Sequence, residues 1–330
     1  MRRGIIAAGN WLSDTIKFIG HYPVVGNLVT IERIEQGFGG CAHNVLADLA
    51  RMQTDLPLYA GGCVGHDALG DEIFSTCKRL GIDTEGLCCV DAATSYTDVM
   101  ADISNGTRTF FHHRGANALF GEEHIDNITV PAKIFHLGYL LLLDRLDAHD
   151  EEYGTVAARL LDKLQKRGYK CSVDVVSEEG NRFRKVILPC LRYIDYFIVN
   201  EVEAGACFGR ELRDADGNIL LDEVKAAARF LLDGGVGHTV VIHFPEGGYG
   251  LRKSGEEHYA PSYRVEPHQI VSSVGAGDAF CAAMLYALHE ELPLDYSLRI
   301  ANAAARFNLF SPTSTDGAPT LAQLEAFLAE

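Results

Sequence analysis

The sequence predicts a three-layer α/β fold, in which helices cover both faces of a mostly parallel sheet, together with a second, smaller β-sheet. Three observations carry this prediction. Short apolar runs alternate with amphipathic segments along most of the 330 residues, a pattern typical of parallel strands joined by helices. Two stretches, residues 14–36 and 92–113, instead alternate polar and apolar residues without a helical period. No internal repeat or linker divides the sequence, so one domain over residues 1–330 is expected.

Six apolar runs are predicted to be buried strands because they are short and continuous. They are Ile5–Ala8, Leu58–Gly61, Ile134–Leu137, Cys171–Val175, Tyr196–Val199 and Thr239–His243. The helical patterns are Ala42–Met52, Leu69–Leu80, Glu152–Lys166, Asp222–Leu232, Ala276–Glu290 and Leu294–Phe310. Ligands of such folds bind outside the carboxyl ends of the strands, so we expect the site there.

The two β-rich stretches do not fit the strand–helix alternation. Tyr96–Asp102, for example, reads YTDVMAD, in which polar and apolar residues alternate. We interpret residues 14–36 and 92–113 as strands of a smaller sheet that leaves the main body and covers the site. The alternative is a hairpin at the edge of the main sheet.

Charge and composition exclude several classes of partner. The chain has 29 Lys and Arg against 45 Asp and Glu, a net charge of −16, which disfavours nucleic acid and anionic membrane surfaces as partners. The apolar run Ile5–Ala8 is too short for a signal peptide, and no later run is long enough to span a membrane. Nine cysteines without a C-x-x-C pair indicate small hydrophobic side chains in a reducing cytoplasm.

The sharpest functional motif is Ser272–Phe280, SSVGAGDAF, which leads directly into an apolar helix. Small residues ahead of a helix leave backbone N–H groups free at the positive end of the helix dipole, and such a site binds anions. Asp278 stands in the first turn of this helix. It could be a general base for a hydroxyl that attacks phosphorus, or an acidic residue that only stabilises the helix start. The motif alone leaves both roles open.

A glycine-rich turn, Gly37–Asn44 (GFGGCAHN), has the G-x-G-x-x-A spacing of a dinucleotide-binding loop. Such a loop would also need an acidic residue at the end of the next strand, and Leu58–Cys63 contains none. A nicotinamide dehydrogenase is therefore disfavoured. The G-x-x-x-x-G-K-[ST] motif of P-loop NTPases does not occur in the sequence.

The third motif is Asn200–Glu203 (NEVE), which ends a predicted strand and opens a helix. Asn200 and Glu203 have the spacing of a capping box, in which each side chain satisfies a backbone amide of the other. Alternatively, both side chains face the cleft and order Mg²⁺ through water.

These three motifs, in this order, resemble those of the ribokinase-like (PfkB-type) family of carbohydrate and nucleoside kinases. The glycines and Asn of Gly39–Asn44 are similar to its N-terminal signature, Gly275–Asp278 to its C-terminal signature, and Asn200–Glu203 to its N-x-x-E motif. Gly65–Gly70 and Arg114–Asn117 also resemble family segments. The resemblance spans nearly the whole chain, and the two β-rich stretches fall where the family has its lid.

The resemblance implies a ribokinase-like sandwich with a β-sheet lid that uses ATP and Mg²⁺ to phosphorylate a sugar hydroxyl. It assigns catalysis to Gly275, Ala276, Gly277 and Asp278, with Asp278 as the base and backbone amides as an anion hole. It assigns acceptor binding to Asp14, Gly40, Asn44 and Arg114. It assigns nucleotide binding to Asn200, Glu203, His243, Gly248 and Asn302. Of these, Asn200 and Glu203 would also position Mg²⁺ through water. A homodimer through the lid is expected with it.

Two departures from the family pattern matter. Family members commonly have Asp-Thr before the C-terminal signature, and the Asp side helps to bind an activating monovalent cation. Here both positions are serine, Ser272 and Ser273, which puts that cation in doubt. Cys41 also stands where many ribokinases have lysine.

The sequence leaves the identity of the acceptor open. A nucleoside kinase of the same family would need an aromatic slot, which Phe110, Phe111 and Phe120 could supply, whereas His112–Arg114 favours a polar or anionic acceptor. A non-catalytic sugar-binding regulator is a further alternative, which the intact Asp278 disfavours. We expect an ATP-dependent sugar kinase.

Overall fold

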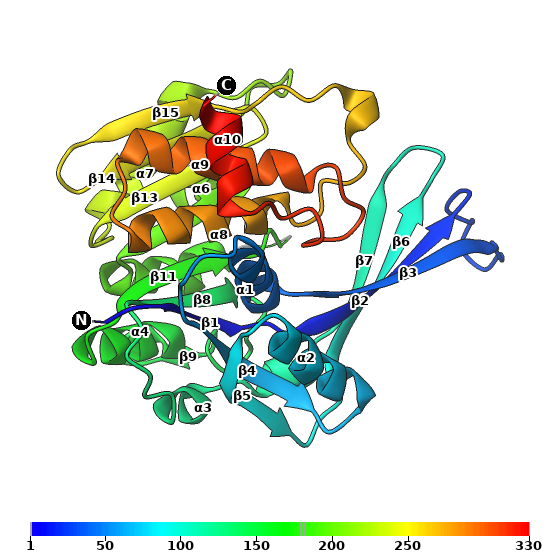
Figure 1. The fold of residues 1–330 in the computed structure, drawn as a ribbon, viewed down its shortest axis with the longest axis horizontal. Coiled ribbons are helices and arrows are strands. Elements are labelled where there is room, and N and C mark those ends of the chain that lie inside the picture. Colours follow the sequence, from blue (N-terminus) through cyan, green and yellow to red (C-terminus); the bar gives the residue numbers. More distant parts are fainter. Residues whose placement is uncertain (1, 179, 181, 330) are drawn as a thin grey trace.

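A computed structural model describes residues 2–178, 180 and 182–329, and it confirms the predicted layers (Figure 1). Within these ranges the central sheet has nine strands; the seven from β13 to β5 pair in parallel, and β14 and β15 extend one edge by antiparallel pairings. In spatial order they are β15 (Glu257–Pro261), β14 (Gly247–Arg252), β13 (Thr239–Phe244), β12 (Tyr196–Asn200), β11 (Lys170–Val175), β8 (Ile134–Leu140), β1 (Ile5–Gly9), β4 (Leu58–Gly65) and β5 (Asp83–Val90).

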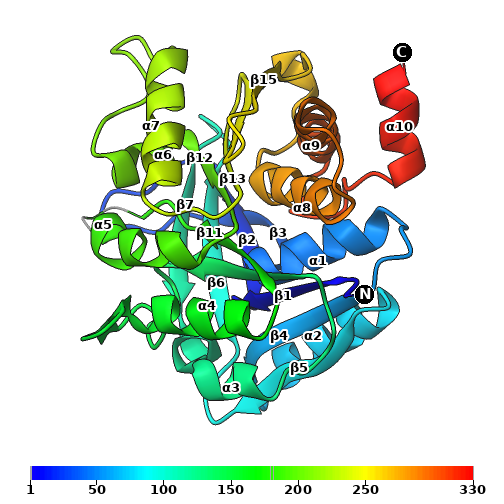
Figure 2. The ribbon, with the colours of Figure 1, turned by 90° about the vertical axis from the view of Figure 1, so that its left-hand side faces the viewer.

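Helices cover both faces of this sheet, as Figure 2 shows. One face carries α3 (Glu122–Asp126), α4 (Val156–Lys166), α5 (Phe183–Val186), α6 (Glu201–Phe208) and α7 (Leu221–Asp233). The other carries α1 (Cys41–Arg51), α2 (Ala68–Arg79), α8 (Ala276–His289), α9 (Leu294–Asn308) and α10 (Leu321–Ala329). Side chains of a strand alternate between faces, so Ile6 and Ala8 of β1 enter one hydrophobic core while Ile5 and Ala7 enter the other.

The second sheet projects from the main body and has the strand order β3-β2-β6-β7 (Figure 1). Its strands are β2 (Leu12–Ile19), β3 (Ile31–Gly39), β6 (Ser95–Asp102) and β7 (Arg108–His113). It is hydrogen-bonded separately from the central sheet, so the alternative of an edge hairpin is wrong. We call this four-stranded sheet the lid. Because β2 follows β1 and β3 leads into α1, the lid is anchored beside the carboxyl end of β1.

The remaining elements are short. They are β9 (His149–Asp150), β10 (Gly154–Thr155) and the 3₁₀ turns Gly115–Leu119, Leu188–Tyr193 and Pro267–Gln269. Among the described residues, no helix is both long and apolar enough to cross a membrane.

The structure corrects several predicted elements. The helix predicted from Glu152 begins at Val156, because Gly154 has a φ of 83° and the Thr155 hydroxyl caps the helix by accepting from the Ala158 amide at 3.1 Å. Strands β5, β14 and β15 were not predicted. β5 lies at the sheet edge with exposed residues at alternate positions, and β14 is rich in glycine, so neither is a continuous apolar run.

Candidate active site

Asp278 is the centre of a hydrogen-bonded group built from three elements. It lies in the first turn of α8 and is buried. Its Oδ1 accepts a hydrogen bond from the Tyr139 hydroxyl at 2.6 Å, and its Oδ2 accepts one from the Asn44 side-chain amide at 2.8 Å. The Oδ1 of Asn44 in turn accepts from the Ser314 hydroxyl at 3.1 Å, which fixes the orientation of the amide. The structure therefore brings the predicted Asp278 and Asn44 together.

The environment of Asp278 shifts its proton affinity. Burial raises the pKa of this carboxyl above its ordinary range, while the hydrogen bonds from Tyr139 and Asn44 oppose the rise. A carboxylate with a raised pKa accepts a proton more readily than an exposed one. The group is thus suited to general-base chemistry.

The start of α8 leaves backbone amides available beside Asp278. Gly275 precedes the helix with a φ of 81°, and a Cβ there would overlap the Ser314 carbonyl, so only glycine fits. The Ala276 amide donates to the Ser273 carbonyl at 3.3 Å. Over residues 2–178, 180 and 182–329, the Gly277 and Asp278 amides donate no hydrogen bond within the chain. Two of the three predicted anion-hole amides are therefore free to bind a ligand.

Asp14 lies on β2, at the base of the lid. It pairs with Thr97 of β6, whose hydroxyl hydrogen-bonds it, and a Cβ on Gly39 would overlap its carboxylate. Burial raises the pKa of Asp14 to about 7; the Thr97 hydrogen bond opposes the rise, and the nearby Asp278 charge adds to it. The positive charge of Arg108 partly offsets this repulsion.

Three further polar residues share the face of the lid that carries Asp14. The strand pairings place Glu35, Arg108 and His112 on that face. Each has a buried polar atom without a partner among the described residues: Oε2 of Glu35, Nη1 of Arg108 and Nε2 of His112. Buried polar atoms are ordinarily hydrogen-bonded, so these three atoms could each bind a polar ligand. Glu35 and Arg108 were not among the predicted site residues, although polar residues alternate in phase with Asp14 along these strands.

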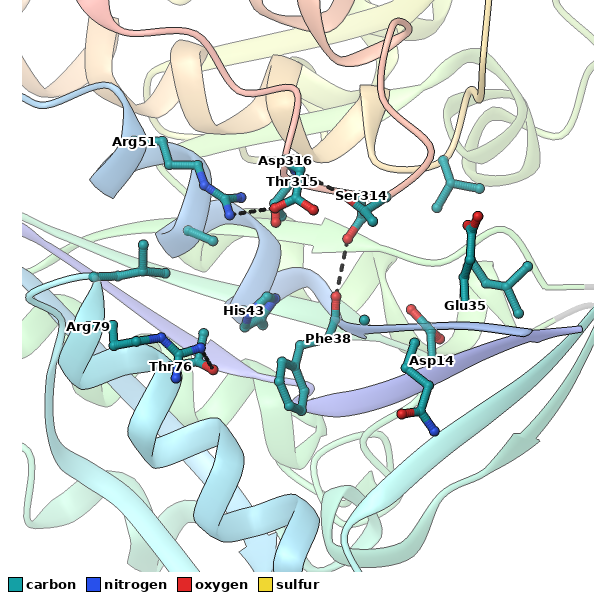
Figure 3. A pocket seen from close by; sticks show the side chains of 17 residues that line it. Asp14, Glu35, Phe38, His43, Arg51, Thr76, Arg79, Ser314, Thr315 and Asp316 are labelled. Carbon is teal, nitrogen blue, oxygen red and sulfur yellow. Dashed lines mark hydrogen bonds and ion pairs between the residues drawn. The ribbon is translucent and has the colours of Figure 1, made fainter. Parts of the chain in front are cut away.

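A cavity of about 210 Å³ opens beside Asp14, as Figure 3 shows. The base of the lid, α1, α2 and the segment 313–316 enclose it. Arg51 of α1 forms an ion pair with Asp316 at 2.6 Å across its rim. This cavity lies on the lid side of the site.

A larger cavity of about 710 Å³ lies on the other side of the α8 N-terminus. This cavity is lined by five of the residues that the resemblance assigns to nucleotide binding or to the anion hole: Asn200, His243, Ala276, Gly277 and Asn302. The His243 ring stacks on Phe280 with centroids 4.9 Å apart, and burial lowers the pKa of His243 to about 4, which keeps the ring neutral. Gly248 pairs with His243 and leaves space for Phe280 behind the cavity wall.

Asn200 and Glu203 form the predicted capping box, which the structure confirms. The backbone amide of Asn200 donates to Glu203 Oε2 at 3.0 Å, and the backbone amide of Glu203 donates to Asn200 Oδ1 at 2.9 Å. The other Glu203 oxygen accepts from Ser177 at 2.8 Å. Burial raises the pKa of Glu203 to about 7. Each carboxylate oxygen retains lone pairs, so a role in ordering Mg²⁺ through water stays a prediction.

The remaining predicted residues differ in their surroundings. Gly40 caps α1 with a φ of 89°, and a Cβ there would overlap the Asn10 carbonyl, so this close approach requires glycine. Arg114 instead pairs with Asp144 at 2.5 Å and donates to the Leu141 carbonyl at 3.3 Å. Both bonds use Nη1, so an acceptor could bind the Nη2 or Nε donors of Arg114 without displacing these partners.

The proposed aromatic slot is not assembled. Phe110 and Phe111 are neighbours on β7 and point to opposite faces of the lid, while Phe120 is fully buried in the core. His113 also points away from Asp14 and packs against the Tyr96 ring, with centroids 5.1 Å apart. Of the aromatic and histidine residues weighed for the acceptor, Phe110 and His112 thus remain on the Asp14 face.

Comparisons with known proteins agree with this architecture. The family model for pfkB family carbohydrate kinases matches residues 14–321. The chain is 23% identical to a deoxyribokinase of Salmonella typhi, with 98% of each chain covered, and 24% identical to the ribokinase of Bacillus subtilis, with 99% of this chain and 100% of the relative covered. A structure of Arabidopsis thaliana ribokinase complexed with ribose and ATP has a TM-score of 0.81 at 20% identity, over 100% of both chains. A structure of an Escherichia coli protein described as ribokinase II, in complex with ATP and Mg²⁺, has a TM-score of 0.75 at 18% identity, over 99% of both chains. The chain belongs to the pfkB family of carbohydrate kinases, phosphotransferases with an alcohol group as acceptor.

Proposed function

We propose that the protein transfers the γ-phosphoryl group of ATP to a hydroxyl of a neutral sugar. The observation that carries this proposal is the buried Asp278 at the start of α8, directly after Ala276 and Gly277, which line the larger cavity, and near enough to Asp14 for its charge to act on that carboxyl. A base for phosphoryl transfer has to stand between nucleophile and phosphate.

Asp278 would take the proton of the acceptor hydroxyl, with Tyr139 and Asn44 holding its carboxylate in place. The free amides of Gly277 and Asp278, at the positive end of α8, would stabilise the charge on the transferred group. Asn200 and Glu203 would hold Mg²⁺ through water, and the ion would neutralise charge on the nucleotide phosphates.

The Asp14 face of the lid supports a neutral, polyhydroxylated acceptor. Asp14 and Glu35 offer hydrogen-bond acceptors, while Arg108 and His112 offer a donor and a titratable ring. Burial lowers the pKa of Arg108, while the nearby Glu35 and Asp14 charges oppose this shift and offset the charge of the guanidinium. An anionic acceptor would therefore meet no uncompensated positive charge, and a nucleoside base would find no aromatic pair.

A coupled assay of ADP release tests the proposal. It compares neutral pentoses, deoxypentoses and hexoses with sugar acids, sugar phosphates and nucleosides, each with ATP and Mg²⁺. We expect a neutral sugar to give the highest kcat/KM. Highest turnover with a nucleoside or an anionic sugar would contradict the acceptor assignment. Binding of a sugar without ADP release would favour the non-catalytic regulator.

We further propose that the chain forms a homodimer through the lid. The outer face of the lid exposes Ile34, Tyr96 and Phe111, and its β2–β3 connection exposes Val24, Val25 and Leu28. Contiguous exposed apolar side chains mark interaction surfaces. Light scattering coupled to gel filtration should give twice the chain mass, and Ile34→Lys with Phe111→Lys should give a monomer. A monomeric unmodified protein at micromolar concentration would contradict the proposal.

A further inference from the structure

A second cluster of reactive side chains lies next to the candidate active site. Cys41 Sγ is 3.1 Å from Nε2 of His136 and 3.7 Å from Oδ2 of Asp174. One ligand atom from each of the three residues lies within 4.8 Å of the others, and all three residues are buried. Cys281 Sγ lies 4.0 Å from the same His136 nitrogen. Neither the family resemblance nor the proposed reaction gives these residues a role.

The fold brings them together from separate elements. His136 of β8 pairs with Ser172 of β11, so alternation along β11 places Asp174 on the same face of the sheet. Cys41 is the first residue of α1, which packs on that face, and Cys281 lies on α8 beside it. A Cβ on Gly138 would overlap Cys41 Sγ, so this glycine leaves the space that the thiol occupies.

The donor atoms are oriented toward one another by further hydrogen bonds. His136 Nδ1 lies 3.1 Å from the Ser172 hydroxyl, which leaves Nε2 facing Cys41. Asp174 Oδ1 accepts from the Val175 amide at 2.7 Å, which leaves Oδ2 facing the thiol. Such outer hydrogen bonds orient histidine and carboxylate ligands at metal sites. Burial lowers the pKa of His136 to about 3, so the imidazole is in its neutral, metal-binding form.

The local charge also favours a cation. Burial raises the pKa of Asp174 well above its ordinary range, and repulsion from Glu203 and Asp278 adds to the rise. Two other buried carboxyl groups thus act on Asp174. A divalent cation would relieve this repulsion and stabilise the ionised form of Asp174.

We propose that Cys41, His136 and Asp174 bind Zn²⁺ or a similar thiophilic divalent cation, with Cys281 available as a fourth ligand. With bonds of about 2.0–2.3 Å in tetrahedral geometry, ligand atoms lie roughly 3.3–3.7 Å apart, close to the separations seen here. The sulfur and nitrogen donors select against Mg²⁺, which prefers oxygen ligands. Binding replaces the Cys41 thiol proton, which is released to solvent.

The site would be linked to Asp278 through two short connections. Cys41 and Asn44 share the first turn of α1, and Tyr139 directly follows Gly138; Asn44 and Tyr139 both donate to Asp278. A metal that draws Cys41 toward His136 would shift these two donors. We therefore expect the occupied site to lower kcat.

The test uses the whole protein and metal alone. Cobalt titration should produce the near-ultraviolet charge-transfer band of a thiolate–Co²⁺ bond, and equilibrium dialysis with elemental analysis should give one Zn²⁺ per chain, with release of about one proton. Cys41→Ser and His136→Gln should each weaken Zn²⁺ binding at least tenfold. The matched control is Cys77→Ser, a buried cysteine on α2 outside the cluster, which should bind as the unmodified protein does.

Two results would overturn the proposal. One is the lack of a thiolate–Co²⁺ band and of stoichiometric Zn²⁺ in the unmodified protein, a measurement that needs no variant to fold. The other is binding that survives Cys41→Ser but is lost in a Cys88→Ser, Cys89→Ser double variant, which would place the metal at the adjacent, more exposed cysteines.

Discussion

Replacement of Asp14 separates the acceptor end of the cleft from the nucleotide end. Asp14 lines the smaller cavity, which we propose for the acceptor, whereas the larger cavity, which we propose for the nucleotide, lies on the other side of the α8 N-terminus. An ionised carboxylate that accepts hydroxyl hydrogen bonds contributes about 1.5–3 kcal/mol per bond. Since about 1.4 kcal/mol is a factor of ten in affinity, Asp14→Ala should raise the acceptor KM at least tenfold and change the ATP KM by less than about twofold.

The pH dependence gives a second readout of the same substitution. The pKa of Asp14 is about 7 in the folded protein, against an ordinary value of 3.8. Acceptor binding that needs the ionised carboxylate should therefore improve as the pH rises through about 7, and Asp14→Asn should remove this dependence. The folded state also binds more protons than the unfolded state between these pKa values, so the ligand-free protein should lose stability as the pH rises from about 4 to about 7. Asp14→Asn should reduce this loss, and the part that remains comes from other buried carboxyl groups with raised pKa values, such as Glu203.

Steady-state kinetics with each substrate varied in turn, from pH 5.5 to 8.5, makes the measurement. Asp98→Asn is the matched control, because Asp98 is on the opposite face of the lid and pairs with Lys17 at 2.7 Å. It should leave both KM values within about twofold, because this partly exposed ion pair is separated from the Asp14 face by the sheet itself. A raised ATP KM with an unchanged acceptor KM for Asp14→Ala would show that the two ends of the cleft are assigned the wrong way round.

Three further predictions concern the neighbours of Asp278. Tyr139→Phe removes a hydrogen bond that opposes the raised pKa of Asp278, so the acid limb of kcat/KM should move to higher pH; an unmoved limb would contradict the assignment. Gly277→Val should raise the ATP KM more than the acceptor KM, because the side chain enters the larger cavity beside His243; equal changes would argue against a nucleotide there. Because Ser272 and Ser273 lack a carboxylate, replacing K⁺ by a bulky organic cation at equal ionic strength should change kcat less than about threefold. Saturable activation by K⁺ would instead show a site built from backbone oxygens.

The sequence predicted those parts of the site that depend on local backbone geometry. Gly275 and Gly40 have positive φ values that glycine adopts most readily, and each stands next to a helix start that carries a functional side chain. Asn200 and Glu203 formed the expected capping box for the same reason, since their contacts are three residues apart. Such features can be predicted from the sequence because the residues that form them are close together along the chain.

Contacts between elements that are far apart in the sequence could not be predicted in this way. Tyr139 reaches Asp278 from the end of β8, and the apolar run that predicted that strand gave no indication of where the hydroxyl would point. Which of Phe110, Phe111 and His112 faces the acceptor depends on the phase of β7 against β6. Cys41, His136 and Asp174 come from α1, β8 and β11, so their proximity follows from the assembled sheet alone.

The central claim is that Asp278 removes the proton from the acceptor hydroxyl. The most direct measurement is the turnover of Asp278→Asn, with ATP binding by calorimetry and thermal unfolding as controls. We expect kcat to fall about 10²–10⁴-fold with ATP affinity retained. The melting temperature should be unchanged or higher, because the substitution removes a buried charge. Near-normal turnover with unchanged melting would contradict the claim and reduce Asp278 to a residue that stabilises the start of α8.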